Sequence, residues 1–219
     1  MEQEKELKQE KELKQEKKQK KSNKLSNFLF VLLLIGLAVG YFFYMKGMVK
    51  PVVSINGTEV TVDMTVQELV DKGFSVGDIE SGNMNLSAQP QIPGESYTST
   101  FYYVYKNGES TNVIFHVYNA GVNSVNLPDS KIYEFRYYLR DKSGKASVLI
   151  NGIDFAGLGK AESIAALEEQ GIKFKASDKD EFMNGDMNII FGDSGDYSYI
   201  LETDTQGDTV TCIEVKRNV

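Results

Sequence analysis

Residues 52–60 read VVSINGTEV and residues 148–155 read VLINGIDF, so an apolar segment that contains Asn-Gly occurs twice in the chain. A second pair of similar segments follows in the same order. Residues 64–74 read MTVQELVDKGF and align without gaps on residues 162–172, which read ESIAALEEQGI. Two matching segments in one order and at similar spacing indicate an internal duplication. We therefore expect two repeated modules, one over residues 51–142 and one over residues 146–219.

Each copy predicts a hairpin followed by a helix. Asn-Gly tolerates positive φ at both central positions of a tight turn, so the dipeptide at residues 56–57 predicts a hairpin between short strands. Thr65 and Glu68 have the spacing of a capping box, which starts a helix by satisfying its first N–H groups. Gly73 then suits the left-handed residue that ends a helix. The same helix is expected before Gly171.

Downstream of each helix the apolar residues alternate with polar ones, which is typical of half-buried strands. We expect strands over residues 101–106, 111–119, 131–140, 187–191, 197–203 and 209–216. An antiparallel sheet needs a cover for its apolar face, and the one helix of each module is the natural cover. The predicted fold class is α+β: an N-terminal transmembrane helix, then two repeated modules, each a β-hairpin, one short helix and an antiparallel β meander.

This order of elements resembles the tandem α+β modules of the SmpA/OmlA-like and β-lactamase-inhibitory-protein-like group. The resemblance is architectural and depends on the helix-ending glycines Gly73 and Gly171, each followed by a β meander. It implies a protein-binding module without catalytic activity. Proteins of that group usually have two short helices per module, and the inhibitors carry disulfides that a chain with one cysteine cannot form. The chain also resembles uncharacterised membrane-anchored proteins of Gram-positive bacteria.

An apolar run precedes the modules. Residues 28–45 contain no charged side chain, and as a helix they would rise about 27 Å, close to the hydrocarbon thickness of a bilayer. We therefore expect a single transmembrane helix over residues 27–48. Five lysines lie just before the run, and only Lys46 and Lys50 follow it closely. The positive-inside rule then places the N-terminus in the cytoplasm and the C-terminal part outside, at the cell membrane.

Two further interpretations of the run stay open. Small residues at Ala38 and Gly40 suit signal-peptide cleavage after Gly40, although the apolar run continues beyond that position. Gly36 and Gly40 also form a GxxxG spacing, which lets two membrane helices approach closely and so predicts a candidate homodimer contact. The alternative is that two glycines have this spacing by chance, because glycine is common in membrane helices.

Charge is distributed unevenly along the chain. Residues 1–26 hold nine lysines and six glutamates and form the expected cytoplasmic tail, whereas the rest holds 15 basic and 25 acidic residues within a formal net charge of −7. An acidic C-terminal part offers no basic surface for phosphates, so a nucleic acid partner is not expected. The predicted partners are the membrane itself and another protein.

The residues that usually carry chemistry are scarce. The chain has one histidine, His116, in a strand-like segment, and one cysteine, Cys212, so a catalytic triad or a zinc site is not expected. We predict no enzyme activity and no cofactor; a carboxylate-based enzyme is a distant alternative. A weak calcium site competes with a simple solvated acidic loop. The carboxylates concerned are Asp178, Asp180, Glu181, Asp186, Asp193 and Asp196.

Tyrosines are the main candidates for binding. They concentrate in the predicted strands of the first module, and alternation predicts that some of them point away from the core. Exposed tyrosines are good anchors for a protein partner, although core and cross-strand packing is the competing interpretation. The candidate partner-binding residues are Tyr102, Tyr103, Tyr105, Tyr137 and Tyr138. The predicted function is a membrane-anchored extracytoplasmic binding or accessory protein; the alternative is a self-associating assembly subunit tethered through Gly36 and Gly40.

Overall fold

The structure is a computed structural model that describes residues 30–37, 40, 48–78, 82–139, 146–174, 182–184, 187–204 and 209–218. The chain divides into two compact units, Met1–Gly47 and Met48–Val219. In the first unit, residues 30–37 and 40 are helical. Within the described residues no helix has the length and apolar character needed to cross a membrane. Most of the predicted span over residues 27–48 lies outside the described residues. The tail over residues 1–26, and residues 38, 39 and 41–47, lie outside the described residues.

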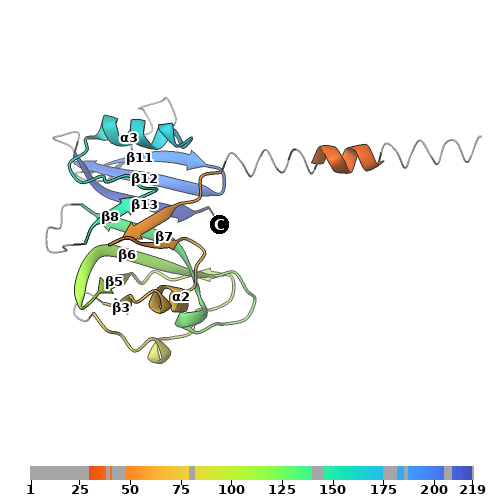
Figure 1. The fold of residues 1–219 in the computed structure, drawn as a ribbon. Helices are drawn as coiled ribbons and strands as arrows, with labels where there is room; N and C mark the ends of the chain where they lie inside the picture. Colours follow the sequence, from red (N-terminus) through yellow and green to blue (C-terminus); the bar gives the residue numbers. More distant parts are fainter. Residues whose placement is uncertain are drawn as a thin grey trace, which may run out of the picture. The chain divides into compact units, whose positions relative to one another are not determined.

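The second unit is built mainly from β-strands (Figure 1). The described helices of this unit are short: α2 (Val66–Asp71), α3 (Lys160–Glu169) and the 3₁₀ turns η1 (Leu86–Ala88) and η2 (Leu127–Asp129). Its strands are β1 (Val52–Ile55), β2 (Thr58–Thr61), β3 (Ser75–Gly77), β4 (Ser96–Tyr97), β5 (Tyr102–Lys106), β6 (Glu109–Asn119), β7 (Lys131–Tyr138), β8 (Val148–Ile150), β9 (Lys173–Phe174), β10 (Phe182–Asn184), β11 (Met187–Ser194), β12 (Tyr197–Asp204) and β13 (Val210–Arg217).

One sheet runs through the whole second unit. Eight of its ten strands follow the order β10-β11-β12-β13-β7-β6-β5-β3, while β4 pairs with β6 and β9 pairs with β11. The centre of the sheet is the antiparallel pair of β7 and β13, in which Phe135 lies opposite Val215. The predicted α+β fold of two repeated modules, each with its own sheet, is therefore wrong. The last strands of the two expected modules pair with each other, because an open strand edge gains hydrogen bonds by pairing.

The predicted local elements agree with the structure. Asn56 and Gly57 have φ of 49° and 76° and join β1 to β2 as a hairpin. The side chain of Thr65 accepts the N–H of Glu68, and the Glu68 carboxylate accepts the N–H of Thr65, so the capping box at α2 is confirmed. Gly73 and Gly171 follow α2 and α3 with φ of 82° and 92°. The six predicted strands correspond to β5, β6, β7, β11, β12 and β13.

The second copy of the hairpin is different. β8 pairs with β1 of the other copy, and its own turn at residues 151–152 is followed by a single bridge between Ile150 and Ile153. β2, β1 and β8 thus make a separate three-stranded sheet. β1 and β8, which belong to these two Asn-Gly segments, pair with each other. They therefore join the first half of the second unit (residues 51–142) to its second half (residues 146–219).

A single hydrophobic core draws on both halves of the second unit. It includes Leu69 of α2 and Leu167 of α3, together with Phe115, Phe135 and Val215 from the middle of the large sheet. All five are almost completely buried. Ile114, Ile200 and Cys212 are also buried but do not belong to this core. Because side chains alternate along a strand, these three lie on the opposite face of the sheet.

Candidate functional site

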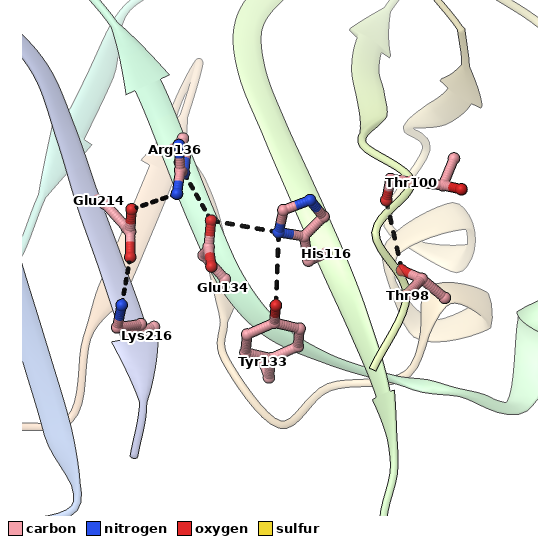
Figure 2. Close-up of polar contacts among 8 residues, drawn as sticks. All are labelled: Thr98, Thr100, His116, Tyr133, Glu134, Arg136, Glu214 and Lys216. Atoms are coloured by element: carbon pink, nitrogen blue, oxygen red, sulfur yellow. Dashed lines mark hydrogen bonds and ion pairs between the residues drawn. The ribbon is translucent and has the colours of Figure 1, made fainter. Parts of the chain in front are cut away.

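The face of the large sheet that points away from the core carries a group of charged side chains at its centre (Figure 2). They come from β6, β7 and β13, and the strand register places them next to one another: His116 opposite Glu134, Glu134 opposite Lys216, and Glu214 opposite Arg136. Phe135, between Glu134 and Arg136, points into the core instead. We call His116, Glu134, Arg136, Glu214 and Lys216 the charged cluster.

Arg136 holds the charged cluster together. Its Nε lies 2.6 Å from Oε1 of Glu134, and its Nη2 lies 2.7 Å from Oε2 of Glu214 on the neighbouring strand. Lys216 places its Nζ 2.7 Å from the other oxygen of Glu214. The two carboxylates outweigh the effect of burial and raise the pKa of Arg136, so the guanidinium remains charged. The cluster is therefore an ion-pair network that bridges β7 and β13.

The network is layered by charge. The side chains of Glu134 and Glu214 are only 5% and 3% exposed, whereas those of Arg136 and Lys216 are 25% and 32% exposed. The carboxylates lie deep and the cationic groups lie nearer to solvent. A buried carboxylate is costly unless it is paired and hydrogen-bonded, which explains why Arg136 contacts both.

His116 lies at one end of the cluster. Its Nδ1 is 3.3 Å from Oε1 of Glu134 and 3.4 Å from the hydroxyl of Tyr133. Its Nε2 is buried and has no hydrogen-bond partner among the described residues. The Phe101 ring stacks on the imidazole, with 4.0 Å between ring centroids. The ring is thus enclosed by aromatic contacts and one carboxylate.

Four aromatic side chains extend the cluster toward the solvent. Tyr97 packs against Tyr118 and Tyr133, with ring centroids 4.6 Å and 4.9 Å apart, and Phe101 lies 5.5 Å from the guanidinium of Arg136. Tyr97 is 46% exposed and Phe101 is 40% exposed. Burial, together with the nearby Glu134, raises the pKa of Tyr133 to about 12, so its hydroxyl stays protonated. We call Tyr97, Phe101, Tyr118 and Tyr133 the aromatic patch.

The segment before β5 positions Phe101. The N–H of Thr98 donates to the carbonyl of Val117 on β6, 3.1 Å away. The Thr98 hydroxyl donates to the carbonyl of Thr100, 3.3 Å away (Figure 2). These bonds hold the segment across β6, next to His116. Phe101 is exposed to solvent, but its ring has fixed neighbours.

The structure does not bring the five tyrosines selected from the sequence together. Tyr102 is buried in the core, where it stacks on Phe115, and Tyr137 packs at the edge of the same core. Tyr103 lies opposite Ile114, and Tyr138 lies opposite Cys212, so these two lie on the face of the charged cluster. The hydroxyl of Tyr105 donates to the carbonyl of Asp78, 2.8 Å away.

The other residues selected from the sequence are also placed by the structure where it describes them. A Cβ built on Gly36 or Gly40 meets no atom within 4 Å. Burial raises the pKa of Cys212, which keeps its thiol protonated. Of the acidic residues considered for calcium, Asp193 and Asp196 lie near the turn between β11 and β12, and the other four lie outside the described residues. In the described part of the chain no group of His, Cys, Asp and Glu is arranged to hold a metal ion.

Of the charged cluster's five members, the sequence singles out only His116, as the one histidine in a strand-like segment. Alternation of Glu134 and Arg136 with the apolar Phe135 was the available signal, since it puts two opposite charges on one face of β7. The partner strand β13 lies almost 80 residues further on, and its pairing with β7 has no local signature.

Comparisons with known proteins found no matching family model, no matching curated protein and no matching solved structure. The resemblance to tandem α+β binding modules thus stays a prediction. The geometry of the charged cluster and the aromatic patch is the basis for the functional proposal.

Proposed function

We propose that the chain is a binding protein without catalytic activity, and that the aromatic patch and the outer cations of the charged cluster contact another protein. The observation that carries this proposal is the exposure of Tyr97 and Phe101 beside Arg136 on a sheet face that is separate from the core. Tyrosine and arginine are enriched among the residues that dominate binding energy at protein interfaces. Aromatic rings also supply contact area at a low cost in side-chain entropy.

The exposed rings of the aromatic patch pack on side chains that are held in place, which favours binding. Tyr97 rests on Tyr133 and Phe101 rests on His116. The Tyr133 hydroxyl contacts Nδ1 of His116, which also contacts the buried Glu134. Side chains that are already held in place lose little conformational freedom when a partner binds. Arg136 pairs with both carboxylates of the cluster, and Lys216 pairs with one of them.

The layering of charge favours one kind of partner. Cationic groups of Arg136 and Lys216 lie nearer to solvent than the carboxylates that neutralise them. A partner that places an apolar or aromatic side chain on Phe101 and a carboxylate near Arg136 would satisfy both features. Charge complementarity of this kind contributes mainly to specificity and to the rate of association.

The location of the domain is proposed from the sequence. The uncharged residues 28–45 and the lysines before them favour a C-terminal part that lies outside the cytoplasm, at the cell membrane. Protease treatment of intact cells tests this location, because an external domain would be digested and a cytoplasmic one would be protected.

Site-specific photo-crosslinking tests the binding proposal. A photo-crosslinking amino acid is placed at Tyr97 in the full chain, and a second variant carries it at the exposed Gln67 on α2. We expect one recurring protein to be captured from position 97 and not from position 67. Capture should be lost when Phe101→Ala is added, since Phe101 is a 40% exposed member of the same patch.

The matched control is Val122→Ala, which removes a side chain that is 79% exposed and lies outside the patch. Capture should survive this change. Equal capture from positions 67 and 97, or capture that persists in Phe101→Ala, would contradict the proposal. Increasing salt should reduce the captured amount, because solvent-accessible charges are screened.

A further inference from the structure

The chain contains the Asn-Gly dipeptide at residues 56–57, 107–108, 151–152 and 184–185, and the first three lie wholly within the described residues. These three share one backbone conformation. Asn56, Asn107 and Asn151 have φ of 49°, 54° and 51°, and the glycines that follow have φ of 76°, 79° and 80°. A Cβ built on any of these glycines meets no atom within 4 Å, so the three turns are equally open around the glycine.

The hydrogen bonds of the three asparagines differ. Oδ1 of Asn56 accepts the N–H of Ser147 at 2.9 Å, and its own N–H donates to the Ser147 carbonyl at 2.8 Å. Oδ1 of Asn151 accepts the N–H of Val52 at 2.8 Å, and its own N–H donates to the Val52 carbonyl at 2.7 Å. Each of these two turns is therefore tied, through its side chain and backbone, to the backbone of the other half.

Asn107 forms no such tie. Its turn joins β5 and β6 at an exposed end of the large sheet, and its side chain forms no hydrogen bond within the described residues. Two residue pairs, Tyr105 with Ser110 and Lys106 with Glu109, separate the turn from an irregularity in the strand pairing. The Asn107 side chain can therefore rotate without breaking a hydrogen bond, unlike the asparagines of the other two turns.

We propose that Asn107 is a site of spontaneous covalent modification, namely deamidation through a succinimide, and that Asn56 and Asn151 are protected from it by the fold. In this reaction the backbone nitrogen of Gly108 attacks Cγ of Asn107. A bond forms between these two atoms, the bond from Cγ to Nδ2 breaks, and ammonia leaves with the proton of the Gly108 N–H. Water then opens the five-membered ring to give aspartate or isoaspartate.

Rotation of the asparagine side chain and backbone is the step at which the three sites differ. Cγ must move toward the following nitrogen, which would break the tie to Ser147 at Asn56 and the tie to Val52 at Asn151. At Asn107 there is no corresponding bond to break. An isoaspartate at this position adds a methylene to the backbone and a negative charge, and so disturbs the pairing of Lys106 with Glu109.

Peptide mapping by mass spectrometry tests the proposal. The full folded chain is kept in mildly alkaline buffer, digested with a protease that is active at acidic pH, and each asparagine is scored over time. We expect Asn107 to convert about tenfold or more faster than Asn56 and Asn151, since the two hydrogen bonds that hold each protected asparagine, taken together, correspond to such a ratio. In strong denaturant the three rates should converge, because all three sites then present the same dipeptide.

Three results would overturn the proposal. One is conversion of Asn56 or Asn151 as fast as that of Asn107 in the folded chain. A second is the same ranking in the denatured chain, because the difference would then come from neighbouring sequence and not from the fold. The third is an Asn107 that stays intact when denatured chain converts readily.

Discussion

The carboxyl groups of Glu134 and Glu202 lie on the same face of the sheet, yet their pKa values shift in opposite directions. Burial disfavours the charged form of Glu134, but hydrogen bonding from His116 and the charge of Arg136 outweigh it and lower the pKa. At Glu202 burial raises the pKa, and the attraction of Arg136 only partly offsets it. The contacts of Glu134 with His116 and Arg136 therefore decide the sign of its pKa shift.

These shifts predict opposite effects of pH for two matched variants. Ionised Glu134 stabilises the folded state, and this contribution is lost as pH falls below the ordinary value of 4.5 through the lower folded-state pKa. Glu134→Gln should thus be less stable than wild type at neutral pH, with the difference shrinking in acid. Ionised Glu202 is disfavoured in the folded state, so Glu202→Gln should be more stable at neutral pH, and its advantage should also shrink as pH falls.

Urea unfolding over a series of pH values measures both differences in free energy. Each variant serves as the control for the other, because both replace a carboxylate by an amide of similar shape on one sheet face. Parallel pH profiles for the two variants would contradict the opposite shifts.

Among the secondary-structure elements, the pair of β1 and β8 is held by side chains as well as by strand pairing. Asn151 accepts the N–H of Val52 and also donates from Nδ2 to the hydroxyl of Tyr199, 2.8 Å away. That hydroxyl donates to the carbonyl of Val49, 3.0 Å away. Tyr199 is completely buried, so the loss of Asn151 would leave a buried hydroxyl with one partner fewer.

Replacement of Asn151 by glycine should therefore destabilise the second unit. Glycine keeps the positive φ of the turn, so Asn151→Gly removes the side-chain bonds without backbone strain. We expect a loss of about 1–3 kcal/mol in the free energy of unfolding, from denaturant titration. Asn107→Gly is the control, with an expected change of about 0.5 kcal/mol or less, because that side chain forms no hydrogen bond within the described residues. Equal losses would show that the ties contribute nothing.

At the scale of the second unit, the continuous sheet and the shared core link its two halves. β7 of the first half pairs with β13 of the second, and Arg136 forms an ion pair with Glu214 across the same boundary. The core also includes the helices of both halves. Separation of the halves would expose a strand edge and divide the core, so the unit is expected to unfold in one transition.

A core substitution in one half should thus weaken the other half. Leu167 of α3 is completely buried, and Leu167→Ala should cost about 2–5 kcal/mol. We expect the protection of β6 amides against hydrogen exchange, expressed as a free energy, to fall by the same amount, although β6 lies in the first half. Leu69→Ala in α2 is the reciprocal experiment, with β12 as the reporter. If β6 keeps its wild-type protection in Leu167→Ala, the two halves unfold independently and the single transition is disproved.

The elements that depend on neighbouring residues can be predicted from the sequence alone. Positive φ at Asn-Gly, the bonds between Thr65 and Glu68, and the alternation along each strand all act over a few residues, so their patterns are visible in the chain. The aromatic density near the site was visible in the same way. Which tyrosine is exposed was not, because Tyr102 and Tyr103 exchange faces with a shift of one residue in register.

Three features depend on contacts between distant segments: the pairing of β7 with β13, the pairing of β1 with β8, and the cluster around Arg136. Two separate modules and one continuous sheet satisfy the same local patterns equally well. In the first arrangement the final strand of each half keeps a free edge, and in the second the two final strands pair with each other. The free energy that favours this pairing comes from contacts between residues far apart in the chain. The ion pair of Arg136 with Glu214 exists only because that edge is paired.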